Sequence, residues 1–160
     1  MGASANSGTR DPPSWTVQVD PLTTALGFVH VQIEYALSNH VSVYAGPSLH
    51  LFGGLLAAPD DLDFIGIGAE AGVRYYFNGT APAGWWGLAR SVLASLSTTS
   101  GPALSSLGGY VSVLGGYTWI WDDRWVASLG AGVQYLDYQV GGAGPRGFLP
   151  AAHTTIGVAF

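Results

Sequence analysis

A chain of 160 residues is long enough for one domain, and its composition shows no break that would divide it in two. Only 9% of the residues are charged and 48% are hydrophobic, whereas soluble domains carry about 25% charged residues, so we expect something other than water to face much of the surface. The five basic residues are scattered among ten acidic ones, with a net charge of −5, which excludes the clustered positive charge that a nucleic-acid partner requires.

No apolar run approaches the roughly 20 residues that a membrane-spanning helix needs. The 24 glycines and the 12% of aromatic residues favour strands instead, because glycine is poor in helix interiors and aromatic rings fit a pleated surface. Cysteine is absent, which excludes disulfides and cysteine-bound metals. Residues 1–13 are polar and lack the pattern of a signal peptide, so we expect a disordered lead-in that remains after a signal has been removed.

Apolar residues alternate with small or polar ones through the first half of the chain, which is the period of a strand with two different faces. The clearest case is residues 28–37, where every odd-numbered position is apolar and the even-numbered ones include His30, Gln32 and Glu34. The same pattern predicts strands over residues 15–20, 41–52 and 64–77. Four strands are therefore expected before residue 78.

Four further strands are predicted in the second half, over residues 85–98, 107–121, 125–140 and 148–160. The phase of residues 85–98 stays open, because Arg90 shares a face with Trp86, Leu88 and Val92. A β-bulge near residues 87–89 would turn Arg90 inward while its neighbours stay outside.

The connections alternate in length. Tight turns are predicted at residues 38–40 and 122–124, and longer loops at 53–63, 99–106 and 141–147. This is the arrangement of bacterial outer-membrane barrels, which have short periplasmic turns and longer extracellular loops. An even number of strands also brings both termini to the turn side. The sequence therefore predicts an all-β protein, a closed eight-stranded antiparallel up-and-down transmembrane β-barrel over residues 14–160.

A soluble ligand-binding barrel has the same number of strands but places apolar residues inside and charged residues outside. The alternation alone leaves both orientations open. The aromatic residues favour the membrane, because those on the apolar face lie close to strand ends, as an interfacial girdle requires. The predicted girdle consists of Trp15, Tyr35, Tyr75, Phe77, Trp119, Trp121 and Trp125.

The opposite face is then expected to fill the lumen, since an eight-stranded barrel is just wide enough for side chains to occupy it. Buried charges need partners, and we expect Arg74 to form a central ion pair with either Glu70 or Glu34. The predicted polar network of the lumen consists of His30, Gln32, Glu34, Glu70, Arg74, Gln134 and His153. The same face is expected to fill the lumen with Gln18, Asp20, Tyr44, His50 and Tyr76.

Three stretches of the chain resemble the small eight-stranded outer-membrane barrels of Gram-negative bacteria, the OmpA/OmpX-like group. They are PLTTALGFVHVQIEYALSNHVSVYAG, GGYVSVLGGYTWIWDDRWVASLGAGVQY and the ending HTTIGVAF. The resemblance covers residues 15–160 and implies an outer-membrane location in contact with outer-membrane lipids. It also implies that Ile156, Val158 and Phe160 form a C-terminal signal for the barrel-assembly machinery. No motif in it specifies an activity.

We therefore expect a non-enzymatic barrel with a filled lumen and a structural or interaction role, or at most a very narrow pore. Two alternatives stay open: a lipid-modifying outer-membrane enzyme, and a barrel subunit that docks on an envelope protein partner. The enzyme would draw on a serine and a histidine two residues apart, as in His40 with Ser42 or Ser48 with His50. The histidines do not have the spacing of a metal site, so neither a metal nor a cofactor is predicted. Asp60, Asp61 and Asp63 are interpreted as a solvated acidic loop.

Overall fold

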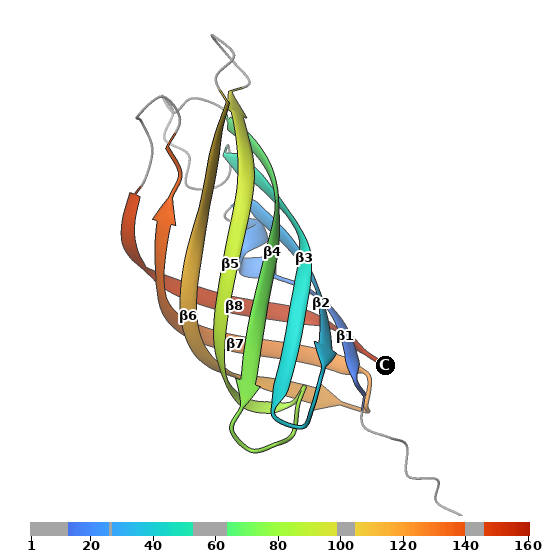
Figure 1. The fold of residues 1–160 in the computed structure, drawn as a ribbon. Helices are drawn as coiled ribbons and strands as arrows, with labels where there is room; N and C mark the ends of the chain where they lie inside the picture. The colour runs from blue at the N-terminus through green and yellow to red at the C-terminus, as the bar shows by residue number, and fades with distance from the viewer. Residues whose placement is uncertain (1–12, 26, 53–63, 99–104, 140–145) are drawn as a thin grey trace, which may run out of the picture.

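Eight antiparallel strands follow one another around a closed barrel in the computed structural model, which describes residues 13–25, 27–52, 64–98, 105–139 and 146–160 (Figure 1). Each strand pairs with its sequence neighbours, and β1 also pairs with β8 to close the ring. The predicted all-β, up-and-down topology is therefore confirmed. The predicted lead-in and the three predicted long loops lie largely outside the described residues.

The elements are β1 (Trp15–Val19), α1 (Pro21–Ala25), β2 (Phe28–Ala36), β3 (Val41–Phe52), β4 (Phe64–Tyr76), β5 (Gly84–Thr98), β6 (Ser105–Trp121), β7 (Trp125–Asp137) and β8 (Arg146–Ala159). Most bounds agree with the predicted strands to within two residues. The strand predicted over 125–140 ends earlier, at Asp137. The strands range in length from five residues in β1 to 17 in β6. At the back of the barrel, β7 and β8 run strongly inclined to the upright strands β3 to β6 (Figure 1).

The short helix α1 was not expected from the sequence. It begins after Asp20, whose carboxylate Oδ1 accepts a hydrogen bond from the backbone N–H of Thr23 at 3.0 Å. Proline at the first helical position suits a helix start, because its fixed φ fits the helix and its missing N–H would have no partner there. The Asp20-Pro21 pair is thus a local signal for this helix. No helix among the described residues is long and apolar enough to cross a membrane.

The two tight turns lie at the same end of the barrel as the start of β1 and the end of β8. In the β6–β7 turn, Asp122 and Asp123 both have positive φ, and the Arg124 N–H donates to the Trp121 carbonyl at 3.0 Å. Two positive φ values define the turn whose twist matches a hairpin. At this same end Trp15 and Phe160 exchange backbone hydrogen bonds of 3.0 and 2.9 Å. The predicted turn side, with both chain ends beside the tight turns, fits this arrangement.

The sheet places the continuous apolar face outside and the more polar face inside. Ile67 and Val113 on the outer face are 69% and 64% exposed, while the charged residues Glu34, Glu70 and Arg74 on the inner face are buried. The strand β5 has no bulge, because its pairing with β4 and β6 is continuous from Trp86 to Ser97. Arg90 faces the lumen together with its apolar neighbours.

The interior therefore contains apolar clusters as well as polar groups, and of their members only Tyr44 and Tyr76 were expected in the lumen from the sequence. One cluster consists of residues on β5, β6 and β7 together with Tyr138, which directly follows β7, and comprises Val92, Ala94, Leu96, Tyr110, Leu136 and Tyr138. A second contains Tyr44, Tyr76, Trp86, Leu88, Leu114 and Ala151. A residue's hydrophobicity alone thus does not decide which face of the barrel it occupies.

Candidate functional site

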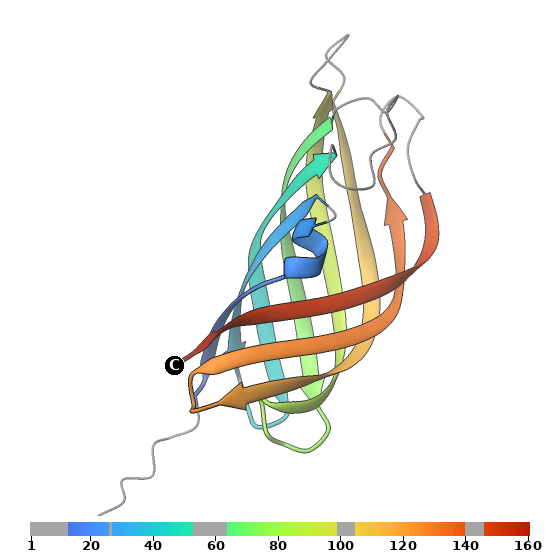
Figure 2. The same ribbon diagram turned by 180° about the vertical axis from the view of Figure 1, so that it is seen from behind.

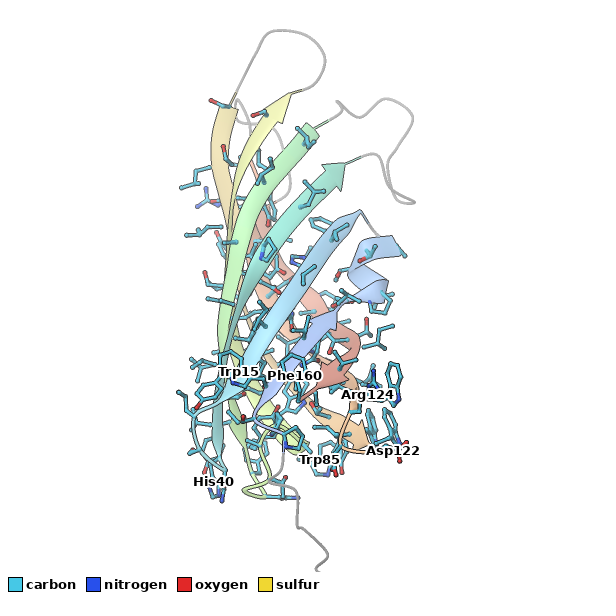
Figure 3. All side chains as sticks on the ribbon, turned by 90° about the vertical axis from the view of Figure 1, so that its right-hand side faces the viewer. Trp15, His40, Trp85, Asp122, Arg124 and Phe160 are labelled. Atoms are coloured by element: carbon cyan, nitrogen blue, oxygen red, sulfur yellow. The ribbon has the colours of Figure 1, made fainter. Side chains whose placement is uncertain are left out.

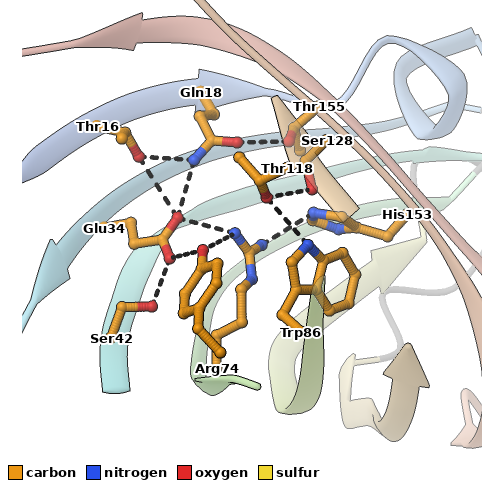
Figure 4. Close-up of polar contacts among 11 residues, drawn as sticks. Thr16, Gln18, Glu34, Ser42, Arg74, Trp86, Thr118, Ser128, His153 and Thr155 are labelled. Carbon is orange, nitrogen blue, oxygen red and sulfur yellow. Dashed lines mark hydrogen bonds and ion pairs between the residues drawn. The ribbon is translucent and has the colours of Figure 1, made fainter. Parts of the chain in front are cut away.

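The carboxylate of Glu34 on β2 is the centre of the polar network in the lumen (Figure 4). Its Oε2 accepts hydrogen bonds of 2.9 Å from Gln18 Nε2 and from Arg74 Nη1. Its Oε1 accepts one of 2.5 Å from Ser42 Oγ and one of 2.9 Å from Tyr76 OH. The donors come from β1, β3 and β4, and all five side chains are buried. These four donors take the place of the water that the buried carboxylate has lost.

Arg74 carries this network across the lumen. Its Nη2 lies 3.0 Å from His153 Nε2 on β8, and its guanidinium lies over the ring of Trp86 at 4.7 Å. The cation–π contact stabilises the charge where water is absent. Of the two predicted partners, the structure selects Glu34, and the ion pair joins β2 to β4 across the intervening strand β3.

Trp86 extends the network to β6 and β7. Its indole Nε1–H donates to Thr118 Oγ1 at 2.9 Å, and the Thr118 hydroxyl donates to Ser128 Oγ at 3.0 Å. The ring fits because the facing positions are Gly116 and Gly130, where a Cβ would lie 2.4 Å from ring atoms of Trp86. The cross-section at this level is consequently filled by side chains that come from every strand of the barrel.

A second group lies further along the inner face. His30 Nδ1 and Glu70 Oε2 are 3.4 Å apart, and both side chains are buried. Gln32 is also buried on this face. Arg90 donates from Nε to Ser112 Oγ at 2.9 Å, and from Nη2 to the Ala152 carbonyl at 3.5 Å. The predicted network is therefore divided into two groups.

Gln134 is the exception among the predicted network residues. It lies on the inner face of β7 but is only half-buried, and it takes no part in the hydrogen bonds described around Glu34. Its partner in register on β8 is Leu149. Among the described residues, β1 pairs with β8 only from Ile156 to Ala159, so no strand adjoins Leu149 on its other side. The reason is thus local: Gln134 lies beside the part of the barrel that β1 does not cover.

Several residues of the network were not included in the prediction. Small hydroxyl residues at alternate inner positions were the available signal, and Trp86 was missed because the phase of its strand was open. The added members are Thr16, Ser42, Trp86, Arg90, Thr118, Ser128 and Thr155, and they are joined by Gln18 and Tyr76, which were expected among the side chains that fill the lumen.

The seven predicted girdle residues all lie exposed at the turn end of the barrel, near the labelled Trp15, Trp85 and Phe160 (Figure 3). Trp15 packs on Tyr35 with ring centroids 4.4 Å apart, and Tyr75 meets Phe77 at 5.7 Å. Trp85 and Tyr117, which the prediction omitted, join the same belt with a centroid distance of 5.1 Å. We call these nine residues the aromatic belt: Trp15, Tyr35, Tyr75, Phe77, Trp85, Tyr117, Trp119, Trp121 and Trp125.

The remaining predicted positions are separated from this site. Ile156 and Phe160 are exposed on the outer face of the last strand, and Val158 is half-buried between them. His40 is exposed in a turn, whereas Ser42 is buried in the lumen as a donor to Glu34. Ser48 is buried, and the side chain of His50 lies outside the described residues, as do Asp60, Asp61 and Asp63. No group of three or more metal-ligating side chains occurs in the described part of the chain.

Comparison of the chain with protein-family models, curated proteins and solved structures gives no match. The geometry of the lumen and of the outer face therefore carries the functional argument.

Proposed function

We propose that the protein is a non-enzymatic outer-membrane β-barrel of a Gram-negative envelope, with a lumen closed by side chains and a structural or interaction role. It spans the bilayer with its strands and passes at most very small solutes. Outer-membrane lipids are its immediate surroundings.

The distribution of charge is the observation that carries this proposal. Among the described residues, charged side chains lie either in the lumen or at the two ends of the barrel. The outer wall between these ends is apolar, and a membrane-spanning barrel needs such a band, about 25 Å tall. A barrel in water gains nothing from this arrangement. The lumenal set is Asp20, Glu34, Glu70, Arg74 and Arg90, and the terminal set is Asp122, Asp123, Arg124, Asp137 and Arg146.

The aromatic belt supports the same orientation. Tryptophan and tyrosine prefer the boundary between lipid and water, where an apolar ring and a polar N–H or O–H are both accommodated. All nine rings lie at the turn end, beside the short β2–β3 and β6–β7 turns. Short turns face the periplasm in outer-membrane barrels. We therefore place the belt at the periplasmic boundary of the membrane.

The experiment combines solubility with conductance. Purified protein is expected to stay dispersed only with detergent or lipid, and in planar bilayers it is expected to give no stepwise current, because the Glu34 and Trp86 groups fill the lumen. A monodisperse monomer in detergent-free buffer would contradict the membrane location. Large conductance steps would leave that location intact and would instead contradict the closed lumen.

Assembly offers a separate test, since the apolar C-terminal strand suits recognition by the barrel-assembly machinery. We expect Phe160→Ala to lower the fraction of heat-modifiable, folded barrel in bacterial outer membranes severalfold. The matched control is Phe148→Ala, because Phe148 is likewise an exposed aromatic residue on the outer face of β8. Equal losses for the two variants would indicate a general effect of removing an aromatic ring and would argue against a C-terminal signal.

A further inference from the structure

The strand β1 covers only part of the wall between β2 and β8. It pairs with β8 from Thr16 to Val19, opposite Ala159 to Ile156. Beyond Ile156, β8 continues to Arg146 with β7 on one side, and no strand of the described residues pairs with its other side. Figure 2 shows α1 lying where β1 stops, between β2 and the rising part of β8. We call this part of the wall the β2–β8 seam: Phe28–His30 of β2 and residues 146–154 of β8.

Hydrogen bonds show which β8 residues point their backbone groups into the seam. Phe160 bonds to Trp15 of β1, and the Thr154 N–H donates to Asp20 Oδ2 at 3.4 Å. Because alternate residues of a strand point the same way and the β7–β8 register is continuous, Ala152, Pro150 and Phe148 also face the seam. Proline has no N–H to offer, so this edge is poorly suited to pair with another strand.

From Phe148 to Ala152, the side chains of this edge are apolar on both faces of the strand. Phe148 points outward and is 79% exposed, and Pro150 and Ala152 follow it on the same face. Leu149 and Ala151 point inward, like His153 after them. A strand with water or a polar lumen on one side would alternate, as β2 does. Ala151 is buried in the second apolar cluster of the lumen, so Leu149 is the inward apolar side chain of this edge that is left exposed.

Leu149 shows that the inner face is accessible here. Its direct register partner Gln134 is half-buried, and Ser112, Arg90 and Tyr44 further along the same row are 3–5% exposed. Leu149 faces the same interior but is 47% exposed. The difference arises because no strand of the wall covers its free side.

The helix α1 is attached to this edge by a small set of polar contacts. Asp20 Oδ1 accepts a hydrogen bond of 2.7 Å from Thr154 Oγ1, which in turn accepts one of 3.3 Å from the backbone N–H of Leu22. The side chain of Leu22 is exposed and adds to the apolar outer surface beside the seam. The seam is therefore continuous with the face that we assign to lipid.

We propose that an acyl chain of a membrane lipid occupies the β2–β8 seam and reaches the inward face of β8 at Leu149. This inference rests on the proposed membrane location. Exposed edges with unpaired backbone groups are otherwise not tolerated in hydrocarbon. Here Pro150 removes one donor, Asp20 satisfies the N–H of Thr154, and Arg90 donates to the Ala152 carbonyl from inside.

Site-directed spin labelling tests the proposal, because the chain has no native cysteine. Single variants Leu149→Cys, Phe148→Cys and Ala151→Cys are labelled and reconstituted in dimyristoylphosphatidylcholine vesicles. Relaxation by oxygen reports contact with lipid chains, and relaxation by a water-soluble nickel chelate reports contact with water. We expect the label at 149 to be relaxed by oxygen as strongly as that at 148, and the label at buried 151 to be relaxed by neither reagent.

A label at 149 that is relaxed mainly by nickel, or by neither reagent, would overturn the seam proposal while the label at 148 still reports lipid. Nickel relaxation at 148 as well would place this edge outside the hydrocarbon layer and would also overturn the seam proposal, whereas the membrane location is decided by the solubility test. If the label at 151 prevents folding, the comparison of the labels at 148 and 149 still tests the proposal. As a label-free measurement, native mass spectrometry should show about one bound phospholipid fewer for Leu149→Asn than for Phe148→Asn. Equal numbers would contradict the proposal.

Discussion

Glu34 on β2 and Arg74 on β4 form a buried ion pair with 2.9 Å between Oε2 and Nη1, and neither side chain is more than 1% exposed. Removing one partner of such a pair leaves an uncompensated charge away from water, which costs about 3–5 kcal/mol. We expect Arg74→Met to lower the free energy of unfolding by this amount, measured by urea titration in lipid vesicles. Glu34→Gln combined with Arg74→Met should restore part of the loss, since no unpaired charge then remains.

The matched control for this prediction is the ion pair of Arg146 and Asp137, whose N···O distance is 3.4 Å. Both side chains are largely exposed, and exposed pairs contribute little because water screens them. Arg146→Met should leave the unfolding midpoint unchanged. A similar loss in Arg146→Met and Arg74→Met would show that burial is not what makes the Glu34–Arg74 pair important.

Gly116 and Gly115 are neighbours on β6 that differ in what surrounds them. A Cβ at Gly116 would lie 2.3 Å from the Leu129 carbonyl oxygen and 2.4 Å from the Trp86 ring, whereas the nearest atom to one at Gly115 is 3.8 Å away. Overpacking typically costs about 1–3 kcal/mol. We expect Gly116→Ala to reduce stability by this amount and to change the near-ultraviolet circular dichroism of Trp86. Gly115→Ala should do neither, and a loss in both variants would indicate that strand entropy or propensity dominates.

Much of the fold follows from alternation alone. The period of two in residues 28–37 places Ile33 and Tyr35 outside and Gln32 and Glu34 inside, and a one-residue slip would exchange the faces. In such a strand, a uniformly apolar face is enough to predict which side chains point outward and which point into the lumen. The tight turn at Asp122 also limits the register of β6 with β7. These features made the number, order and faces of most strands predictable.

The remaining features depend on contacts between strands that alternation does not encode. Trp86 and Arg90 share the inner face of β5 because glycines on β6 and β7 leave room for the ring and Ser112 accepts a hydrogen bond from the guanidinium. Likewise Glu34 and Glu70 are both inner-face carboxylates, and only the pairing of the strands makes Glu34 the partner of Arg74. The pattern within one strand therefore cannot predict these contacts between strands.

Val113 and Leu107 test the membrane orientation on one face of one strand. Val113 lies six positions before Trp119 of the aromatic belt, close to the middle of the 9–11 residues that a strand needs to cross the hydrocarbon layer. Leu107 lies beyond that span on the same outer face. An arginine at the bilayer midplane costs about 2–4 kcal/mol, and near the boundary about 0–1 kcal/mol.

We therefore expect Val113→Arg to destabilise the barrel by about 2–4 kcal/mol in lipid vesicles, and Leu107→Arg by no more than about 1 kcal/mol. Both residues are already more than 60% exposed, so in water an arginine would be tolerated equally well at the two positions. A depth-dependent loss thus reports the surrounding solvent and not the packing of the barrel. If Val113→Arg were as stable as Leu107→Arg, the outer wall would not face lipid, and the closed lumen would belong to a water-soluble barrel.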